Sequence, residues 1–186
     1  MKRRLSLIWY AIARGVVEIT CRMLWRVEIR GQDRLPGTGA YVIAPVHRSN
    51  VDTLLAGCLT HRRIRFMGKD SLWKYRWSGA LFSSLGAFPV HRGTPDREAL
   101  RQCEVAVRGG EPVVLFPEGT RQSGPQLQPL FEGAAFVAAR VGVPILPPER
   151  AEGARLSRRA VAEMTERLNR ELQALFDEAM RAAGRA

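Results

Sequence analysis

The sequence predicts an α/β fold: a single domain with a largely parallel or mixed central sheet flanked by helices, plus an N-terminal amphipathic helix and a long C-terminal helix. Short β-favouring runs alternate with helical patterns along the chain, and apolar residues recur at helical spacing near both ends. The 186 residues, of which 46% are hydrophobic and 25% are charged, suffice for one core. We expect residues 1–26 to form the terminal helix and residues 27–186 to form the domain.

The first expected helix covers residues 3–26 and is amphipathic. Its apolar positions share one side: Leu5, Ile8, Trp9, Ile12, Val16, Ile19 and Met23. Its charged positions lie on the opposite side: Arg4, Arg14, Glu18 and Arg22. A cationic helix that also carries tryptophan is typical of a membrane interface, where the apolar stripe inserts among acyl chains. The alternative is that the stripe packs against the domain.

The following elements alternate in type. The expected strands are Tyr41–Ala44, Arg63–Phe66, Ala87–Val90, Val113–Phe116 and Val143–Leu146. The expected helices between and after them are Val51–Cys58, Pro95–Val107, Glu132–Val141 and Ser157–Ala183. Asp96 is a plausible N-cap, and Gly109 with Gly110 gives the helix after it a stop.

The formal net charge of +11 predicts partners with negative charge: nucleic acid, an anionic membrane surface or phosphorylated substrates. Cys21, Cys58 and Cys103 are widely spaced, so we expect reduced structural thiols and neither a disulfide framework nor a zinc site. No apolar run reaches the length of about 18 residues that a membrane-spanning helix needs, and the N-terminus lacks a signal-peptide cleavage site. We expect a protein that does not cross the bilayer.

Two further runs combine basic and aromatic residues. Arg62 to Arg65 is either a membrane-facing basic patch or a solvated charged edge. We interpret Trp73, Tyr75 and Trp77 as partly buried packing residues, with the rim of an acyl entrance as the alternative.

Three polar clusters each follow an expected strand: His47 to Asp52, His91-Arg92, and Glu118 to Arg121. In a parallel sheet they gather at the carboxyl edge, where α/β folds place ligands. The spacing H-x4-D lets a carboxylate in the first turn of the next helix accept the Nδ1 proton of His47, which leaves Nε2 free to take a proton from a hydroxyl. The alternative is an ordinary loop histidine beside a helix-capping carboxylate.

This pair equals two members of a hydrolase triad without its serine. No G-x-S-x-G elbow exists in the chain, so the expected nucleophile is the hydroxyl of a second substrate. In the third cluster, Gly119 permits close backbone approach, and Arg121 with exposed amides can hold phosphate oxygens. The alternative for this cluster is a turn with surface charge.

Four blocks together resemble the 1-acylglycerol-3-phosphate acyltransferase family, the PlsC-like glycerolipid acyltransferases of phospholipid biosynthesis. The pair His47-x4-Asp52 and Phe116-Pro-Glu-Gly-Thr-Arg121 looks like the first and third blocks. Gly86-Ala-Phe-Pro-Val-His-Arg92 resembles the second block, and Val143-Pro-Ile-Leu-Pro147 resembles the fourth. The resemblance covers about residues 25 to 147, with the blocks in family order.

The resemblance implies that His47 is the general base and Asp52 orients it. It implies an acceptor phosphate site formed by Arg92, Glu118, Gly119, Thr120 and Arg121. Because Glu118 cannot itself attract phosphate, its expected role is to hold Arg92 or Arg121, or to bond the glycerol hydroxyls.

The implied reaction transfers a fatty acyl group from a thioester, acyl-CoA or acyl-ACP, to the hydroxyl of lysophosphatidic acid, giving phosphatidic acid without a covalent acyl-enzyme. No metal or organic cofactor is expected, because the thioester is already activated. The implied partners are the lysophospholipid, the thioester, an anionic membrane surface and, for one donor class, acyl carrier protein. The expected location is peripheral, on the cytoplasmic face of the membrane.

The chain departs from the family after the fourth block, because Ser157 follows Pro147 by only ten positions where further strands are usual. Glycerol 3-phosphate, another lysophospholipid or a glycolipid is the alternative acceptor. From other classes, a non-catalytic lipid carrier and a basic nucleic-acid-binding domain are the alternatives. The nucleic-acid reading lacks a helix-turn-helix, RNP or zinc-finger pattern, and we expect no nucleic-acid partner.

Overall fold

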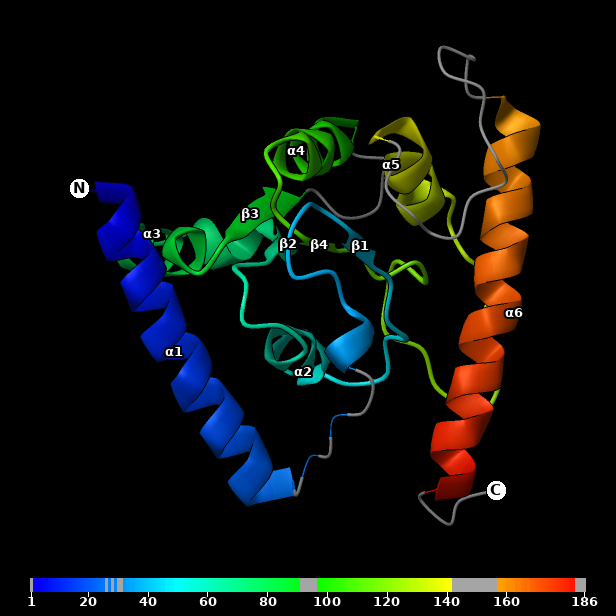
Figure 1. Cartoon of the computed structure of the whole chain (residues 1–186), viewed down its shortest axis with the longest axis horizontal. Coiled ribbons are helices and arrows are strands. Elements are labelled where there is room, and N and C mark those ends of the chain that lie inside the picture. Colours follow the sequence, from blue (N-terminus) through cyan, green and yellow to red (C-terminus); the bar gives the residue numbers. More distant parts are fainter. Residues whose placement is uncertain are drawn as a thin grey trace.

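A parallel four-stranded sheet lies at the centre of the protein (Figure 1). The computed structural model describes residues 2–25, 27, 29, 32–90, 97–141 and 157–182. The strand order is β1-β4-β2-β3, and every neighbouring pair is parallel. The strands are β1 (Val42–Ile43), β2 (Arg65–Lys69), β3 (Ala87–Val90) and β4 (Val113–Val114).

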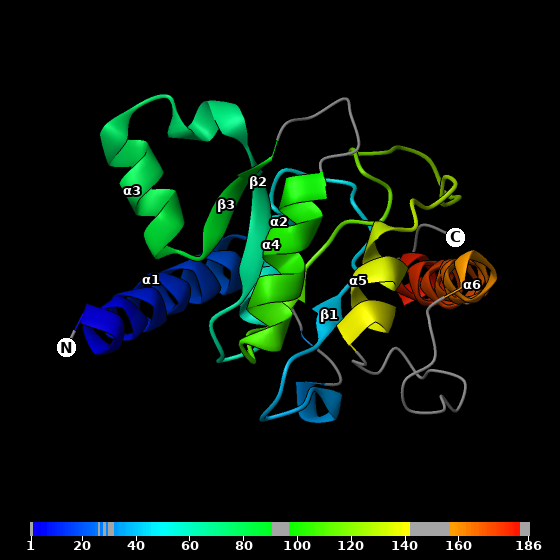
Figure 2. The ribbon, with the colours of Figure 1, turned by 90° about the horizontal axis from the view of Figure 1, so that it is seen from above.

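Helices cover both faces of this sheet (Figures 1 and 2). Helices α4 and α5 lie over one face, and α1 and α2 lie on the other. The helices are α1 (Lys2–Trp25), α2 (Asp52–Cys58), α3 (Arg76–Ser84), α4 (Arg97–Arg108), α5 (Gly133–Val141) and α6 (Arg158–Ala182). Two 3-10 turns, Gln32–Arg34 and Asp70–Trp73, complete the described elements.

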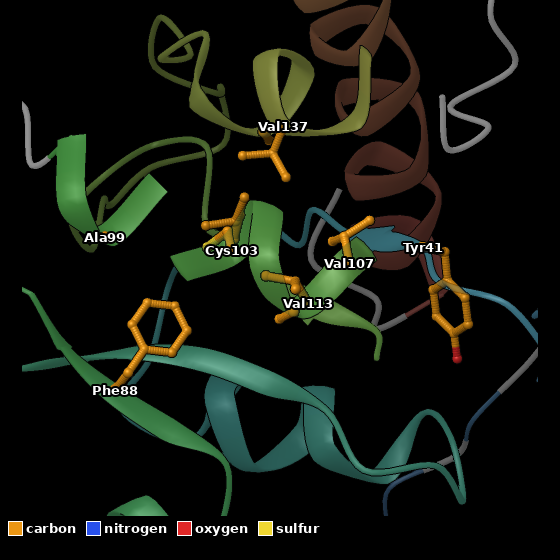
Figure 3. Packing of buried hydrophobic residues seen from close by; sticks show 10 residues of the cluster. Tyr41, Phe88, Ala99, Cys103, Val107, Val113 and Val137 are labelled. Atoms are coloured by element: carbon orange, nitrogen blue, oxygen red, sulfur yellow. The ribbon is translucent and has the colours of Figure 1, made fainter. Parts of the chain in front are cut away.

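The two residues of β4 pack on opposite faces of the sheet, because successive side chains of a strand point to opposite faces. Val113 packs with Cys103, Val107 and Val137 from α4 and α5 (Figure 3). Val114 packs on the other face in a cluster with Tyr10, Ala56 and Ile64. Because both faces are covered, β4 is apolar at both positions, which is typical of a parallel strand.

The predicted α/β architecture is confirmed, with a fully parallel sheet among the described strands. The strand predicted at Ala87–Val90 has those bounds, whereas the one predicted at Arg63–Phe66 lies further along the chain as β2. Helix α4 ends at Arg108, and Gly110 follows with a φ of 81°, which supports the predicted helix stop at Gly109 and Gly110. Helix α3 was not predicted. The Val143–Leu146 strand, the Asp96 cap and His91 lie outside the described residues.

Helix α1 packs through its polar side. Tyr10 and Cys21 are buried, and Arg14 forms an ion pair with Glu18 (Nη1 to Oε2, 2.8 Å) while donating to Nδ1 of His61 (2.7 Å). The apolar stripe is exposed: Ile8, Trp9, Ile12, Val16, Ile19 and Met23. The interpretation that this stripe packs against the domain is therefore wrong except at Trp9, whose indole Nε1 donates to Oγ of Ser84 in α3 (3.2 Å).

The basic run and the aromatic run also differ from their interpretations. Arg62 donates to the carbonyl oxygens of Gly39 and Gly110, and Arg65 is half-buried over the ring of Phe88, so these arginines are structural. Burial lowers the pKa of the Arg65 guanidinium. Trp77 and Tyr75, whose rings stack on each other, are both exposed, so the interpretation that they are partly buried packing residues is wrong.

The three cysteines are buried and free, as expected. Burial raises the pKa of Cys58 to about 11 and that of Cys103 to about 12, because the thiolate loses its hydration. Within the described part of the chain, no helix combines the length and the apolar character needed to span a bilayer.

Candidate active site at the carboxyl edge of the sheet

The loops that follow β1 and β4 meet at one edge of the sheet. The two strands are paired in parallel, with Val42 opposite Val113, so their carboxyl ends point the same way. The first loop carries His47 and the second carries Glu118. A backbone bond joins the loops directly, since the amide of Gln122 donates to the carbonyl of His47 (2.9 Å).

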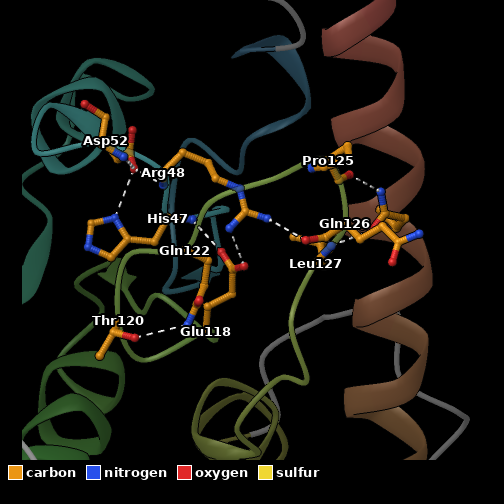
Figure 4. Close-up of polar contacts among 11 residues, drawn as sticks. His47, Arg48, Asp52, Glu118, Thr120, Gln122, Pro125, Gln126 and Leu127 are labelled. Carbon is orange, nitrogen blue, oxygen red and sulfur yellow. Dashed lines mark hydrogen bonds and ion pairs between the residues drawn. The ribbon is translucent and has the colours of Figure 1, made fainter. Parts of the chain in front are cut away.

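His47 and Asp52 are hydrogen-bonded at this edge (Figure 4). The Nδ1 of His47 lies 3.0 Å from Oδ2 of Asp52. The same oxygen accepts the backbone amides of Arg48 and Ser49, each at 2.6 Å, so the carboxylate also closes the turn. Because a carboxylate accepts only, the Nδ1 position carries the proton and Nε2 is left as a proton acceptor. The spacing H-x4-D thus produces the geometry that general-base chemistry needs.

The ring of His47 stacks on Phe116. Their centroids are 4.1 Å apart and the planes are 26° from parallel. The side chain of His47 is largely shielded from solvent but not fully buried. Phe116 therefore supports one face of the imidazole while Asp52 sets its rotation.

Glu118 is buried, with 2% of the residue exposed, and binds the other loop. Its Oε2 accepts the backbone amide of His47 (2.8 Å), and its Oε1 accepts Nη1 of Arg48 (2.7 Å) (Figure 4). Glu118 was expected to hold Arg92 or Arg121, or to bond the glycerol hydroxyls; its ion-pair partner in the structure is Arg48, and Arg92 lies outside the described residues. Arg48 is the nearer guanidinium because it follows His47 directly in the loop that Glu118 faces.

Arg121 reaches the same loop by a different contact. Its Nη1 donates to Oδ1 of Asn50, which lies between His47 and Asp52 in sequence. Arg121, Thr120 and Gly119 are exposed, so their polar groups face solvent at the edge that carries His47. Gly119 has a φ of 70°, and a Cβ there would meet the ring of Phe131 at 2.8 Å, so the position favours glycine.

The structure brings six of the seven predicted site residues to this edge, while Arg92 lies outside the described residues. They are His47 in the loop after β1, Asp52 in the first turn of α2, and Glu118, Gly119, Thr120 and Arg121 in the loop after β4. Sequence reasoning missed Arg48, Asn50 and Phe116 as contacts. Their only signal was position, since all three lie inside the two motif blocks. Among the described residues, no cluster of His, Cys, Asp or Glu is arranged to hold a metal ion.

Comparisons with known proteins show which sequences and folds this chain is similar to. Residues 26–148 match the family described as "Acyltransferase". The 1-acyl-sn-glycerol-3-phosphate acyltransferase of Bacillus subtilis is 30% identical over 140 residues, covering 74% of this chain and 69% of that protein. The chloroplastic 1-acyl-sn-glycerol-3-phosphate acyltransferase BAT2 of Brassica napus is 30% identical over 141 residues, covering 73% of this chain but only 40% of that protein.

A solved structure shares the fold. The crystal structure of the 1-acyl-sn-glycerophosphate (LPA) acyltransferase PlsC from Thermotoga maritima matches with a TM-score of 0.58 and 19% identity, covering 78% of this chain and 70% of that one. At this identity the match speaks for the architecture alone. The family match over residues 26–148 and the Bacillus relative lead to one conclusion: the chain belongs to the acyltransferase family, in the group of the glycerolipid enzymes of phospholipid biosynthesis.

Proposed function

We propose that this acyltransferase moves a fatty acyl group from acyl-CoA or acyl-ACP to the free hydroxyl of lysophosphatidic acid, giving phosphatidic acid. The observation that carries the proposal is the His47–Asp52 pair at 3.0 Å, on the same sheet edge as Arg121. The names of the Bacillus and Brassica relatives support this acceptor. Glycerol 3-phosphate, other lysophospholipids and glycolipids are the competing acceptors within the family.

His47 supplies the proton chemistry. Its Nε2 takes the proton of the acceptor hydroxyl as that oxygen attacks the thioester carbonyl carbon. The tetrahedral intermediate then collapses, the carbon–sulfur bond breaks, and the thiolate leaves with the proton that the imidazolium returns. Asp52 holds the ring in the correct tautomer and stabilises the imidazolium. The acyl group passes directly between substrates, so no acyl-enzyme forms.

The acceptor phosphate is positioned by the second and third blocks. Arg121 is exposed beside the His47 loop, and its guanidinium can exchange the Asn50 oxygen for phosphate oxygens. Thr120 adds an exposed hydroxyl, and the glycine before it lets the backbone approach closely. We assign Arg92 to the same phosphate by family resemblance. Such clamping fixes the distance between hydroxyl and Nε2, which is the main requirement for an activated donor.

The protein docks peripherally on an anionic membrane through α1. The stripe of Ile8, Ile12, Val16, Ile19 and Met23 is exposed although it is apolar, and the helix begins with Lys2, Arg3 and Arg4. Moving exposed apolar surface from water into lipid contributes about 25 cal/mol of binding free energy per Å². The basic side chains are attracted to anionic headgroups. Both lipid substrates would then be delivered within the membrane plane. We assign the cytoplasmic face, because it keeps the three free thiols reduced.

An acceptor panel tests the proposed reaction. Purified protein is supplied with acyl-CoA or acyl-ACP and with lysophosphatidic acid, glycerol 3-phosphate or lysophosphatidylcholine in mixed vesicles, and released thiol and lipid products are measured. We expect phosphatidic acid from lysophosphatidic acid at the highest kcat/KM. A higher kcat/KM with another acceptor would identify that lipid as the substrate in place of lysophosphatidic acid. The absence of thiol release with every acceptor would indicate a lipid carrier.

The same mixtures test direct transfer. Without acceptor, we expect neither stoichiometric thiol release nor an acyl mass added to the protein. A burst of thiol and an acylated peptide would instead indicate a covalent intermediate.

A further inference from the structure

The buried carboxylate of Glu118 lies beneath the loop that carries the base. Its side chain has 0% exposure, and both oxygens are engaged by the protein, at 2.8 Å from the His47 amide and 2.7 Å from Arg48 Nη1. A charged group this deeply buried is tolerated only when it is paired and hydrogen-bonded. Its bonding capacity is thus directed at the protein, while the neighbouring Gly119, Thr120 and Arg121 face solvent.

Four contacts together hold His47. Glu118 accepts its backbone amide, and the amide of Gln122 donates to its carbonyl oxygen (2.9 Å). Asp52 holds Nδ1, and Phe116 stacks on the ring at 4.1 Å. Two of these residues, Phe116 and Glu118, come from the block that follows β4. Because the backbone and the ring are held separately, loss of Glu118 would shift the whole imidazole while leaving its bond to Asp52 able to form.

Arg48 extends this support to the C-terminal helix. Besides Glu118, its guanidinium donates to the carbonyl of Gln126 (Nη2 to O, 3.2 Å) and lies 5.0 Å above the ring of Phe176 in α6. Gln173 of α6 holds the same segment, accepting the amide of Leu127 at 2.8 Å and donating to the carbonyl of Pro125 at 3.2 Å. Helix α6, the segment after the third block and the His47 loop are therefore joined through the guanidinium of Arg48 and the side-chain amide of Gln173.

We propose that Glu118, through its bonds to the His47 amide and to Arg48, is a positioning residue for the base and contacts neither the phosphate nor the glycerol of the acceptor. The inference rests on the proposed role of His47 as base. It assigns the third block two separate tasks: Phe116 and Glu118 hold the imidazole, and Gly119 to Arg121 meet the phosphate. A carboxylate turned away from the substrate also removes like-charge repulsion from the phosphate site.

Steady-state kinetics of Glu118→Gln, with lysophosphatidic acid varied at saturating acyl-CoA, separates the two roles. The variant keeps the size of the side chain and one acceptor oxygen but loses the charge that holds Arg48. A displacement of the base of about 1 Å lowers kcat by about a hundredfold, and we expect this loss with an acceptor KM within about twofold of the wild type. Arg121→Gln should differ by raising the acceptor KM, because it removes a contact with the acceptor phosphate.

Matched variants complete the experiment. Glu163→Gln makes the same chemical change in the exposed ion pair with Arg159 and should leave both constants unchanged. Arg48→Gln should lower kcat in the manner of Glu118→Gln, and the double variant should lose less than the product of the two single losses, because it leaves no unpaired buried charge. Arg48→Lys, which keeps the charge, should recover part of kcat.

The outcomes separate the inference from the function. A raised acceptor KM with normal kcat in Glu118→Gln would overturn the positioning role and leave the reaction intact. If Glu118→Gln fails to fold by circular dichroism, Arg48→Gln decides, and an unchanged kcat in that variant would overturn the inference. If wild-type protein shows turnover that His47→Ala does not reduce, the proposed base fails, and the positioning role falls with it.

Discussion

Helices α1 and α6 carry the same kind of sequence pattern and use it in opposite ways. Helix α6 turns its apolar side inward, where Val161, Met164 and Leu172 are buried. Helix α1 turns its apolar side outward and packs through Tyr10, Arg14 and Glu18. Periodicity therefore shows that a helix has an apolar face, but not whether that face meets protein or another apolar phase.

The largest difference between the helices should appear in vesicle binding. Ile12 and Ile19 of α1 are 55% and 61% exposed. Replacing both in the variant Ile12→Ser/Ile19→Ser should weaken binding to anionic vesicles by about a hundredfold, since each isoleucine contributes about 1.5 kcal/mol or more on burial. Sedimentation with lipid measures the effect.

The control comes from α6. Leu175 is 60% exposed and lies outside the stripe, so Leu175→Ser should leave vesicle binding unchanged. Equal losses in both variants, or none in the α1 variant, would mean that α1 does not insert. Wild-type binding that added salt does not weaken would contradict the electrostatic share of the attraction.

The next difference concerns folding stability. Leu172 of α6 is 8% exposed, so Leu172→Ala should reduce the free energy of unfolding by about 2–3 kcal/mol through lost burial and a cavity. Ile19→Ala should change it by less than about 0.5 kcal/mol in the absence of lipid. Urea denaturation followed by circular dichroism checks both. A larger loss from Ile19→Ala would show that the stripe packs against the domain after all.

The smallest expected effect is on folding stability and concerns Tyr10, on the side of α1 that packs against the domain. The Tyr10 hydroxyl accepts the backbone amide of Ile64 (3.2 Å), and Tyr10→Phe should cost about 1 kcal/mol. Burial, the largest influence, raises the pKa of Tyr10 above its ordinary value of 10.0. The folded state therefore keeps the Tyr10 proton to a higher pH than the unfolded state does. The contribution of Tyr10 to the free energy of unfolding is complete below pH 10 and is lost as the pH rises further.

Measuring the free energy of unfolding of the wild type and of Tyr10→Phe at pH 9 and pH 11 isolates the contribution of Tyr10. The difference in stability between the two proteins should shrink at the higher pH. A difference that grows with pH would contradict the assignment of burial as the cause.

Local chemistry explains what the sequence could predict. Strand and helix patterns located the elements of the sheet because each strand is short, apolar and followed by a turn signal. The His47–Asp52 bond could be anticipated because five positions across one turn bring the two groups together. The stop after α4 followed from glycine at a positive φ.

Long-range choices explain what could not be predicted. The pairing of Glu118 with Arg48 joins residues 70 positions apart, and several arginines were chemically equal candidates. The outward face of α1 depends on whether Tyr10 and Arg14 find partners near Ile64 and His61. Similarly, Arg62 gave no local sign that it bonds backbone carbonyls, because the strands that bring those carbonyls together are distant in sequence.

The central claim, that His47 takes the proton of the acceptor hydroxyl, is tested most directly by the rate of thiol release from acyl-CoA on addition of lysophosphatidic acid. His47→Ala should lower this rate by about a hundred- to ten-thousandfold. His61→Ala, which removes an exposed imidazole bonded to Arg14, should leave it unchanged. Turnover by His47→Ala at the wild-type rate would contradict the claim.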